Sequence, residues 1–205
     1  MVPLRYRYSN AVLILIIINI LVFAAGRLLG QRLIAGYMAM IPAAVLQGRV
    51  WTFITYMFVH GGISHIFFNM FALFIFGTRV EQRMGTSEFL LFYFISGVLA
   101  GIFSFAVYVL TGSYNIALMG ASGAIYAVQL AYAVFYPDSY IYIWGILPLR
   151  TPVAVLGFTA LEIISAVAGL NNKVAHFTHL AGFAVAWVYL ALRYRINPWK
   201  ELTGR

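Results

Sequence analysis

The stretch "FLLFYFISGVLAGIFSFAVYVL", from Phe89 to Leu110, contains no charged side chain. A helix of about 20 apolar residues crosses the hydrocarbon core of a bilayer. This run is therefore long enough to span a membrane. The composition agrees, because only 9% of the 205 residues are charged, against about 25% in a typical soluble domain. The sequence predicts a protein that is solvated mainly by lipid.

Five other apolar runs accompany this stretch, and "YPDSY" between two of them predicts a turn. In lipid, backbone polar groups are satisfied within helices. We therefore expect an all-α membrane protein with a six-transmembrane-helix bundle, forming a single domain over residues 1–205 with its core at about 9–193. The six predicted spans are Ser9–Ala25, Ile63–Thr78, Phe89–Leu110, Ser122–Tyr136, Thr151–Leu170 and Val174–Leu192.

The basic residues predict the orientation of these spans. The net charge is +8, but the basic side chains are scattered along the connections, which argues against nucleic acid as a partner. Membrane proteins keep such residues mainly on the cytoplasmic side. Six spans put both termini on one side, which we expect to be the cytoplasm. That side would hold Arg5, Arg7, Arg79, Arg83, Arg150, Arg193, Arg195, Lys200 and Arg205, and the other Arg27, Arg32, Arg49 and Lys173.

The first connection, about residues 26–62, is too apolar for a free loop. Aromatic side chains are enriched where lipid headgroups meet water. We expect this segment to form short helices in the membrane interface, with Trp51 and Tyr56 at headgroup level.

Polar residues in three of the spans fall at a similar depth. The second, fourth and sixth spans run in the same direction, from outside to inside. Each carries a polar residue near its beginning: His65 and Asn69, which share a helix face at i and i+4, then Ser122, and then His179. Independent core residues have no reason to coincide in depth. The pattern indicates one site near the outer leaflet.

The residue types at this depth suit nucleophilic catalysis. A serine hydroxyl becomes a good nucleophile when a base, usually histidine, takes its proton. Gly120 and Gly123 on either side of Ser122 allow a tight turn and a close helix contact. At a helix start the Ser122 N–H lacks an intrahelical partner, so with His65 and Asn69 it can stabilise an oxyanion.

Four motifs make the sequence resemble the rhomboid family of intramembrane serine proteases. They are "HGGISHIFFN" (His60, His65, Asn69), "EQRMG" from Glu81, "GASGAIY" (Gly120, Ser122, Gly123, Tyr126) and "HFTHLAGF" (His179, Gly182). They occur in the family's order between about residues 49 and 190. The family often has Trp-Arg in the outer connection, whereas here Thr52 follows Trp51 and Arg49 precedes it, which leaves the anchoring of that connection open.

The resemblance implies a function and a role for each matched residue. Ser122 and His179 would form a catalytic dyad without an acid, and His65, Asn69 and the Ser122 N–H would form the oxyanion hole. Tyr126 would pack against the ring of His179, and His60 would organise the outer connection through hydrogen bonds. Glu81 would make structural hydrogen bonds at the cytoplasmic end. The substrate would be a transmembrane segment of another protein, cut near the outer leaflet without a cofactor, in a prokaryotic cell membrane.

The sequence leaves open the roles of His176 and Glu162 and two alternative functions for the protein. His176 is a weaker candidate for the base, because only His179 has the H-x-x-G spacing to Gly182. Glu162 could orient His179, line a water path or bond to another helix, and we favour the structural role. The histidines have no neighbouring acid in sequence, which argues against zinc. A transporter would place polar groups nearer the midplane. A catalytically inactive rhomboid-like scaffold should lack Ser122 or His179.

Overall fold

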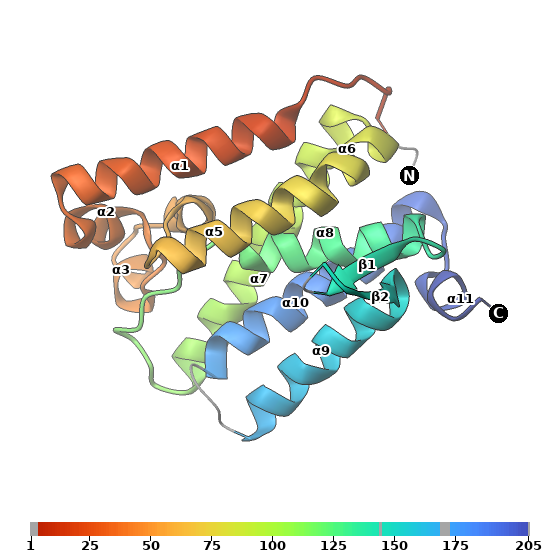
Figure 1. Ribbon diagram of the computed structural model, residues 1–205. Coiled ribbons are helices and arrows are strands. Elements are labelled where there is room, and N and C mark those ends of the chain that lie inside the picture. Colours follow the sequence, from red (N-terminus) through yellow and green to blue (C-terminus); the bar gives the residue numbers. More distant parts are fainter. Residues whose placement is uncertain (1–3, 144, 169–172, 205) are drawn as a thin grey trace.

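The computed structural model describes residues 4–143, 145–168 and 173–204, and they form a mostly helical bundle (Figure 1). Six helical segments of the described residues overlap the six predicted spans, and residues 169 and 170 of the fifth predicted span lie outside the described residues. Two of them continue through a wider π-helical turn, η2 (Leu73–Gly77) or η3 (Leu190–Tyr194). The segments are α1 (Ala11–Leu29), α5 (Ile63–Ala72) with η2 and α6 (Thr78–Met84), α7 (Thr86–Leu110), α8 (Ser122–Phe135), α9 (Thr151–Ala168), and α10 (Lys173–Tyr189) with η3.

Within the described residues, three of these segments are long and apolar enough to cross a membrane: Ala11–Leu29, Ile63–Met84 and Thr86–Leu110. Two shorter apolar helices, Ser122–Phe135 and Thr151–Ile164, accompany them. A short helix that carries polar residues is easier to accommodate when protein rather than lipid surrounds it.

Helix α8 lies in the centre of the bundle, between α5–α6, α7, α9 and α10 (Figure 1). Its buried face is rich in small residues, including Gly123, Ala124 and Ala127. Helices in membranes associate through close packing of such residues, because lipid provides no hydrophobic drive. The backbones of α8 and α10 touch where Gly182 meets Gly123, and a side chain at Gly182 would overlap the Gly123 carbonyl.

The first connection forms short helices, as expected: α2 (Gln31–Met38), α3 (Pro42–Leu46), α4 (Thr52–Thr55) and the 3₁₀ helix η1 (Tyr56–Phe58). Several side chains form hydrogen bonds within it, among them those of Arg49 and Trp51. Arg49 donates to the Gly36 carbonyl at 3.0 Å, and the Trp51 indole N–H donates to the Tyr37 carbonyl at 3.1 Å. Arg49 therefore anchors the connection from its position before the tryptophan.

The expected headgroup position of Tyr56 is wrong. Its side chain is buried in the core, and its hydroxyl donates to the Gly97 carbonyl at 2.7 Å. Gly101 on α7 leaves room for the ring, since an added Cβ there would lie 2.8 Å from the Tyr56 Cε1. The aromatic side chain therefore joins the connection to α7.

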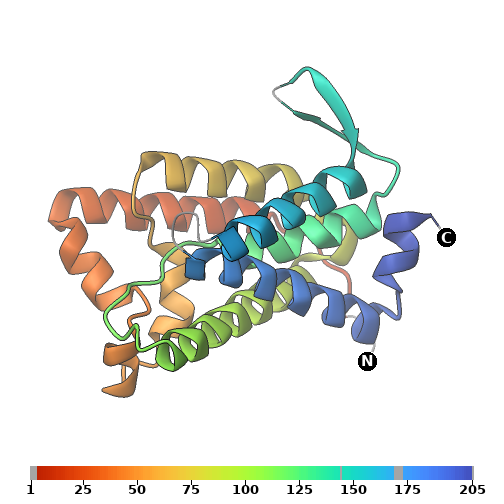
Figure 2. The same cartoon turned by 90° about the horizontal axis from the view of Figure 1, so that it is seen from below.

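Two buried acids, Glu81 and Glu88, lie at the end of the bundle that holds the start of α1 and the end of α10. Figures 1 and 2 show this end. Glu81 is fully buried and accepts hydrogen bonds from the N–H groups of Ala11 and Val12 at 2.8 and 2.9 Å. These N–H groups begin α1 and have no intrahelical partner. The contacts agree with the structural hydrogen bonds expected for Glu81.

The all-α prediction needs one correction, because the connection from α8 to α9 contains a β-hairpin. Strand β1 (Tyr140–Ile143) pairs antiparallel with β2 (Leu147–Arg150), with Tyr140 opposite Arg150. The hairpin projects from the bundle in Figure 2. The predicted turn at "YPDSY" precedes it, and the β-branched and aromatic "YIYI" favours a strand. The last helix, α11 (Pro198–Thr203), follows η3.

Candidate active site

The turn before α8 is held by the first connection. Gly120 has φ +115°, a conformation that favours glycine. Its N–H donates to the Tyr56 carbonyl at 2.9 Å, and Leu118 pairs with Met40 through backbone hydrogen bonds of 2.8 and 3.0 Å. An added Cβ at Gly120 would lie 2.7 Å from Nε2 of His65. The turn therefore brings the chain against His65 and starts α8 at Ser122.

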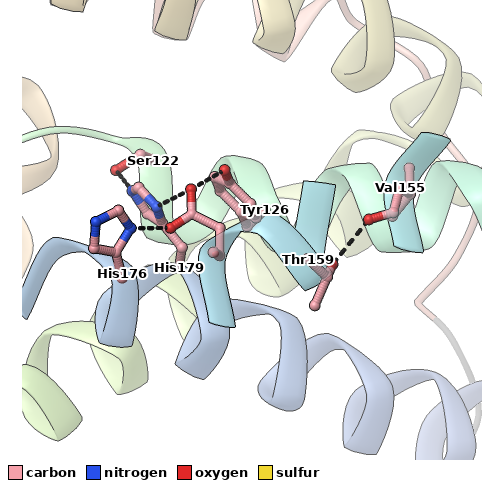
Figure 3. Close-up of polar contacts among 7 residues, drawn as sticks. Ser122, Tyr126, Val155, Thr159, His176 and His179 are labelled. Carbon is pink, nitrogen blue, oxygen red and sulfur yellow. Dashed lines mark hydrogen bonds and ion pairs between the residues drawn. The ribbon is translucent and has the colours of Figure 1, made fainter. Parts of the chain in front are cut away.

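Ser122 and His179 meet across the contact between α8 and α10. The Ser122 Oγ lies 2.8 Å from the His179 Nε2, which is hydrogen-bonding distance (Figure 3). The glycine contact of Gly123 with Gly182 lies next to this pair in sequence and brings the two helices close enough for it.

The ring of His179 is held from one side by Tyr126. This tyrosine lies one turn after Ser122 on α8, and the two rings stack with centroids 4.3 Å apart and planes 7° from parallel. Because the stack fixes the plane of the imidazole, Nε2 stays directed at the serine and Nδ1 points away from it.

Glu162 on α9 lies on the Nδ1 side of the His179 ring. The Tyr126 hydroxyl donates to its Oε1 at 2.5 Å, and Nδ1 of His176 contacts its Oε2. Nδ1 of His179 lies 3.1 Å from Oε1, within ion-pair distance but not aligned as a hydrogen bond. The favoured cross-link from Glu162 to another helix is present. The sequence did not indicate that its partners include the candidate base.

A cavity of about 530 Å³ opens beside these residues. Five residues that the sequence assigned to one site line it together with apolar side chains, among them Phe68 and Leu118. The five are His65, Asn69, Ser122, Tyr126 and His179.

His65 and Asn69 provide hydrogen-bond donors from α5. The Gly61 N–H donates to Nδ1 of His65 at 3.4 Å, so the proton of the neutral ring lies on Nε2, the atom nearest Gly120. The Asn69 amide donates one N–H to the His65 carbonyl at 2.8 Å. An amide nitrogen carries a second N–H, and Asn69 lines the same cavity.

His60 lies behind the cavity lining. Its side chain is fully buried and packs edge-on against His65, with ring centroids 5.0 Å apart. Its backbone carbonyl accepts a hydrogen bond from Gln31 at 2.9 Å. Among the described residues neither ring nitrogen of His60 has a hydrogen-bond partner, so the hydrogen bonds expected from this side chain are not present. Burial, followed by the repulsion that a protonated His65 would add, lowers the pKa of His60 to about 4, so at neutral pH the ring is uncharged.

The sequence argued against zinc because no acid lies next to the histidines along the chain, but in the structure Glu162 lies beside two of them. Donor atoms of Glu162, His176 and His179 all lie within 4.8 Å of one another. Within this group, His176 and Glu162 contact each other directly.

Comparison with known proteins agrees with the motifs. A family model described as the Rhomboid domain matches residues 47–196. The chain is 31% identical over 191 residues to Rhomboid-like protein 16, chloroplastic, of Arabidopsis thaliana, covering 84% of this chain and 58% of that protein. It is 29% identical over 196 residues to RHOMBOID-like protein 12, mitochondrial, of the same plant, covering 86% and 56%.

A bacterial relative, the Rhomboid protease GlpG of Salmonella choleraesuis, is 29% identical over 126 residues, which cover 62% of this chain and 44% of that protein. The chain spans only about half the length of the curated relatives it matches. With its apolar helices, it is an integral membrane protein. Because the family model covers most of its length, the chain belongs to the rhomboid family.

Proposed function

We propose that this chain is an intramembrane serine endopeptidase that cleaves transmembrane segments of other membrane proteins. The observation that carries the proposal is the 2.8 Å contact between the Ser122 hydroxyl and the His179 Nε2 at a cavity lined by further donors. The printed name of a bacterial relative, Rhomboid protease GlpG, gives further support.

The first half of the reaction forms an acyl-enzyme. His179 takes the proton of the Ser122 hydroxyl at Nε2 while Oγ attacks the scissile carbonyl carbon. The carbonyl oxygen becomes an oxyanion, and His179 then gives its proton to the leaving amine as the peptide C–N bond breaks. In the second half, a water molecule loses a proton to His179 and attacks the acyl carbon. His179 then returns this proton to the Ser122 Oγ as the ester C–O bond breaks, and the peptide with the new carboxyl group leaves.

We assign the stabilisation of the oxyanion to three groups. The Ser122 N–H is the first of α8 and has no intrahelical acceptor. The Nε2–H of His65 and the second N–H of Asn69 come from the cavity wall. Donors arranged before the charge develops lower the barrier with little reorganisation.

We also propose six spans with both termini in the cytoplasm and the cavity towards the outer leaflet. The start of α1, α6, the hairpin and α11 lie towards one end of the bundle (Figures 1 and 2), and these elements carry or adjoin most of the basic residues. Such an excess marks the cytoplasmic side. Phe68, which is 63% exposed and lines the cavity, is placed to gate lateral access of a substrate helix.

The proposal is tested with purified protein in liposomes and a single-span substrate that carries small residues near its outer end. Wild type should cleave it, and Ser122→Ala should not, although its melting temperature stays close to that of wild type, because this change costs a helix little. Cleavage by Ser122→Ala at a rate near that of wild type would rule out the assigned nucleophile. No cleavage by wild type of any substrate tested would favour an inactive scaffold.

A further inference from the structure

We propose that Glu162 is a positioning residue for the base, making a Ser122–His179–Glu162 arrangement in place of a dyad without an acid. This inference rests on the proposed function. Glu162 is the only acidic residue between Thr151 and Leu170. An ionisable side chain within a membrane helix is costly and usually has a specific partner. Here the candidate partner is the imidazole that faces the serine.

Glu162 contacts Nδ1 of His179, the ring nitrogen that does not take the serine proton. His179 can accept the serine proton at Nε2 only if the proton of its neutral ring is on Nδ1. The carboxylate Oε1 of Glu162 is 3.1 Å from Nδ1, and it favours the tautomer with a proton there. When Nε2 takes the serine proton, the ring becomes a cation beside this carboxylate, which stabilises it.

The carboxylate is itself fixed at both oxygens. Oε1 accepts from the Tyr126 hydroxyl at 2.5 Å, and Oε2 contacts His176. Its side chain is only 14% exposed, so water competes weakly for it. Tyr126 also stacks on His179, and one side chain therefore sets the position of both the acid and the base.

The imperfect alignment of the Glu162 and His179 contact fits this role. Catalytic hydrogen bonds in structures without substrate are often long or misaligned and tighten in the complex.

The ionisable side chains that surround the His179 ring come from four elements. They are Glu162 on α9, Tyr126 on α8, His176 on α10 and His65 on α5.

A structural cross-link and a positioning contact predict different kinetics for Glu162→Gln. An amide keeps hydrogen bonds to neighbouring helices but presents the wrong group to Nδ1 and carries no charge. We expect kcat to fall about 10²-fold with KM changed less than about threefold. The loss should be smaller than the roughly 10⁴-fold seen when the acid of a soluble triad is replaced by its amide, because Tyr126 still holds the ring plane.

The matched control is Thr159→Val on the same helix. The Thr159 hydroxyl bonds only to the Val155 carbonyl of its own helix, at 2.9 Å, among the contacts drawn in Figure 3. Its kcat, its KM and its rate of labelling by a fluorophosphonate should equal those of wild type. For Glu162→Gln the labelling rate should fall in parallel with kcat, since both reactions need the serine proton removed.

A second pair keeps the test decisive if Glu162→Gln unfolds. Glu162→Asp and Glu162→Asn have the same size and differ in charge, so any packing defect is shared. We expect the Asp variant to be at least tenfold faster than the Asn variant. Equal rates in this pair, or a Glu162→Gln rate within tenfold of wild type, would overturn the inference while active wild type leaves the proposed function intact.

Discussion

Two acids inside the same bundle, Glu81 and Glu162, have opposite kinds of partner. Glu81 is fully buried, and its oxygens accept from two backbone N–H groups and from the Thr86 hydroxyl at 2.5 Å. Glu162 contacts three ionisable side chains on two other helices. Backbone donors cannot change their charge and so make a permanent fastening. Ionisable partners beside a cavity can exchange protons, as catalysis requires.

Glu88 lies at the same end of the bundle as Glu81, but it has one backbone partner and two ionisable side-chain partners. It pairs with Arg193, and it accepts from the Tyr189 hydroxyl at 2.5 Å and the Leu4 N–H at 2.8 Å. These partners join the beginning of the chain to the start of α7 and the end of α10. The end of the bundle with Glu81 and Glu88 is therefore a closed fastening, and the polar groups at the cavity are open to a ligand.

The largest expected effect comes from removing the base. His179→Ala should reduce cleavage of the single-span substrate as far as Ser122→Ala does, and the double variant should be no slower than either single one. A nucleophile and its base act as a unit, so their losses do not add. Single-turnover rates in liposomes measure this. A double variant that is at least tenfold slower than each single variant would mean that the two residues act in separate steps.

The oxyanion donors should show a graded loss. Removal of one such donor typically lowers the rate by about 10²–10³, so Asn69→Ala should keep measurable activity. His65→Ala should lose more, because His65 also packs against His60 in the first connection. The measurement is kcat on one substrate in one detergent. A normal kcat in both variants would place the donors elsewhere.

The smallest effect on activity is expected from a change at Glu81, at the end of the bundle away from the cavity. Glu81→Gln should keep a kcat near that of wild type, while its free energy of unfolding falls by about 1–3 kcal/mol, because an amide leaves one buried N–H without an acceptor. Thermal unfolding measures the loss, with Glu201→Gln, an exposed acid, as the matched control. A slow but fully stable Glu81→Gln enzyme would remove the distinction between the two acids.

The helical segments and the turn before Ser122 could be predicted because their signals are local. Apolar length shows a span, and a serine between glycines at a helix start shows an unusual turn. The contact of Glu88 with Arg193 joins residues 105 positions apart, and nothing in either segment specifies it. The buried position of Tyr56 likewise depends on the space that Gly101 leaves on α7.

Glu162 was predicted only in part, because its presence in an apolar run is a local signal but its partners are not. The sequence singled it out as an acid in a span, but its partners depend on how α9 packs against α8 and α10. The hairpin was missed for another reason. A search for long apolar runs passes over "YIYI", whose strand tendency is visible only from its β-branched and aromatic residues.

A fluorophosphonate probe tests most directly whether Ser122 is an activated nucleophile. Purified wild type is incubated with the probe, and the modified residue is identified by peptide mass spectrometry, with His179→Ala and Ser122→Ala measured beside it. We predict modification of Ser122 in wild type, a strongly reduced rate in His179→Ala, and none in Ser122→Ala. Labelling of Ser122→Ala at the rate of wild type, or modification of a different serine, would contradict the account.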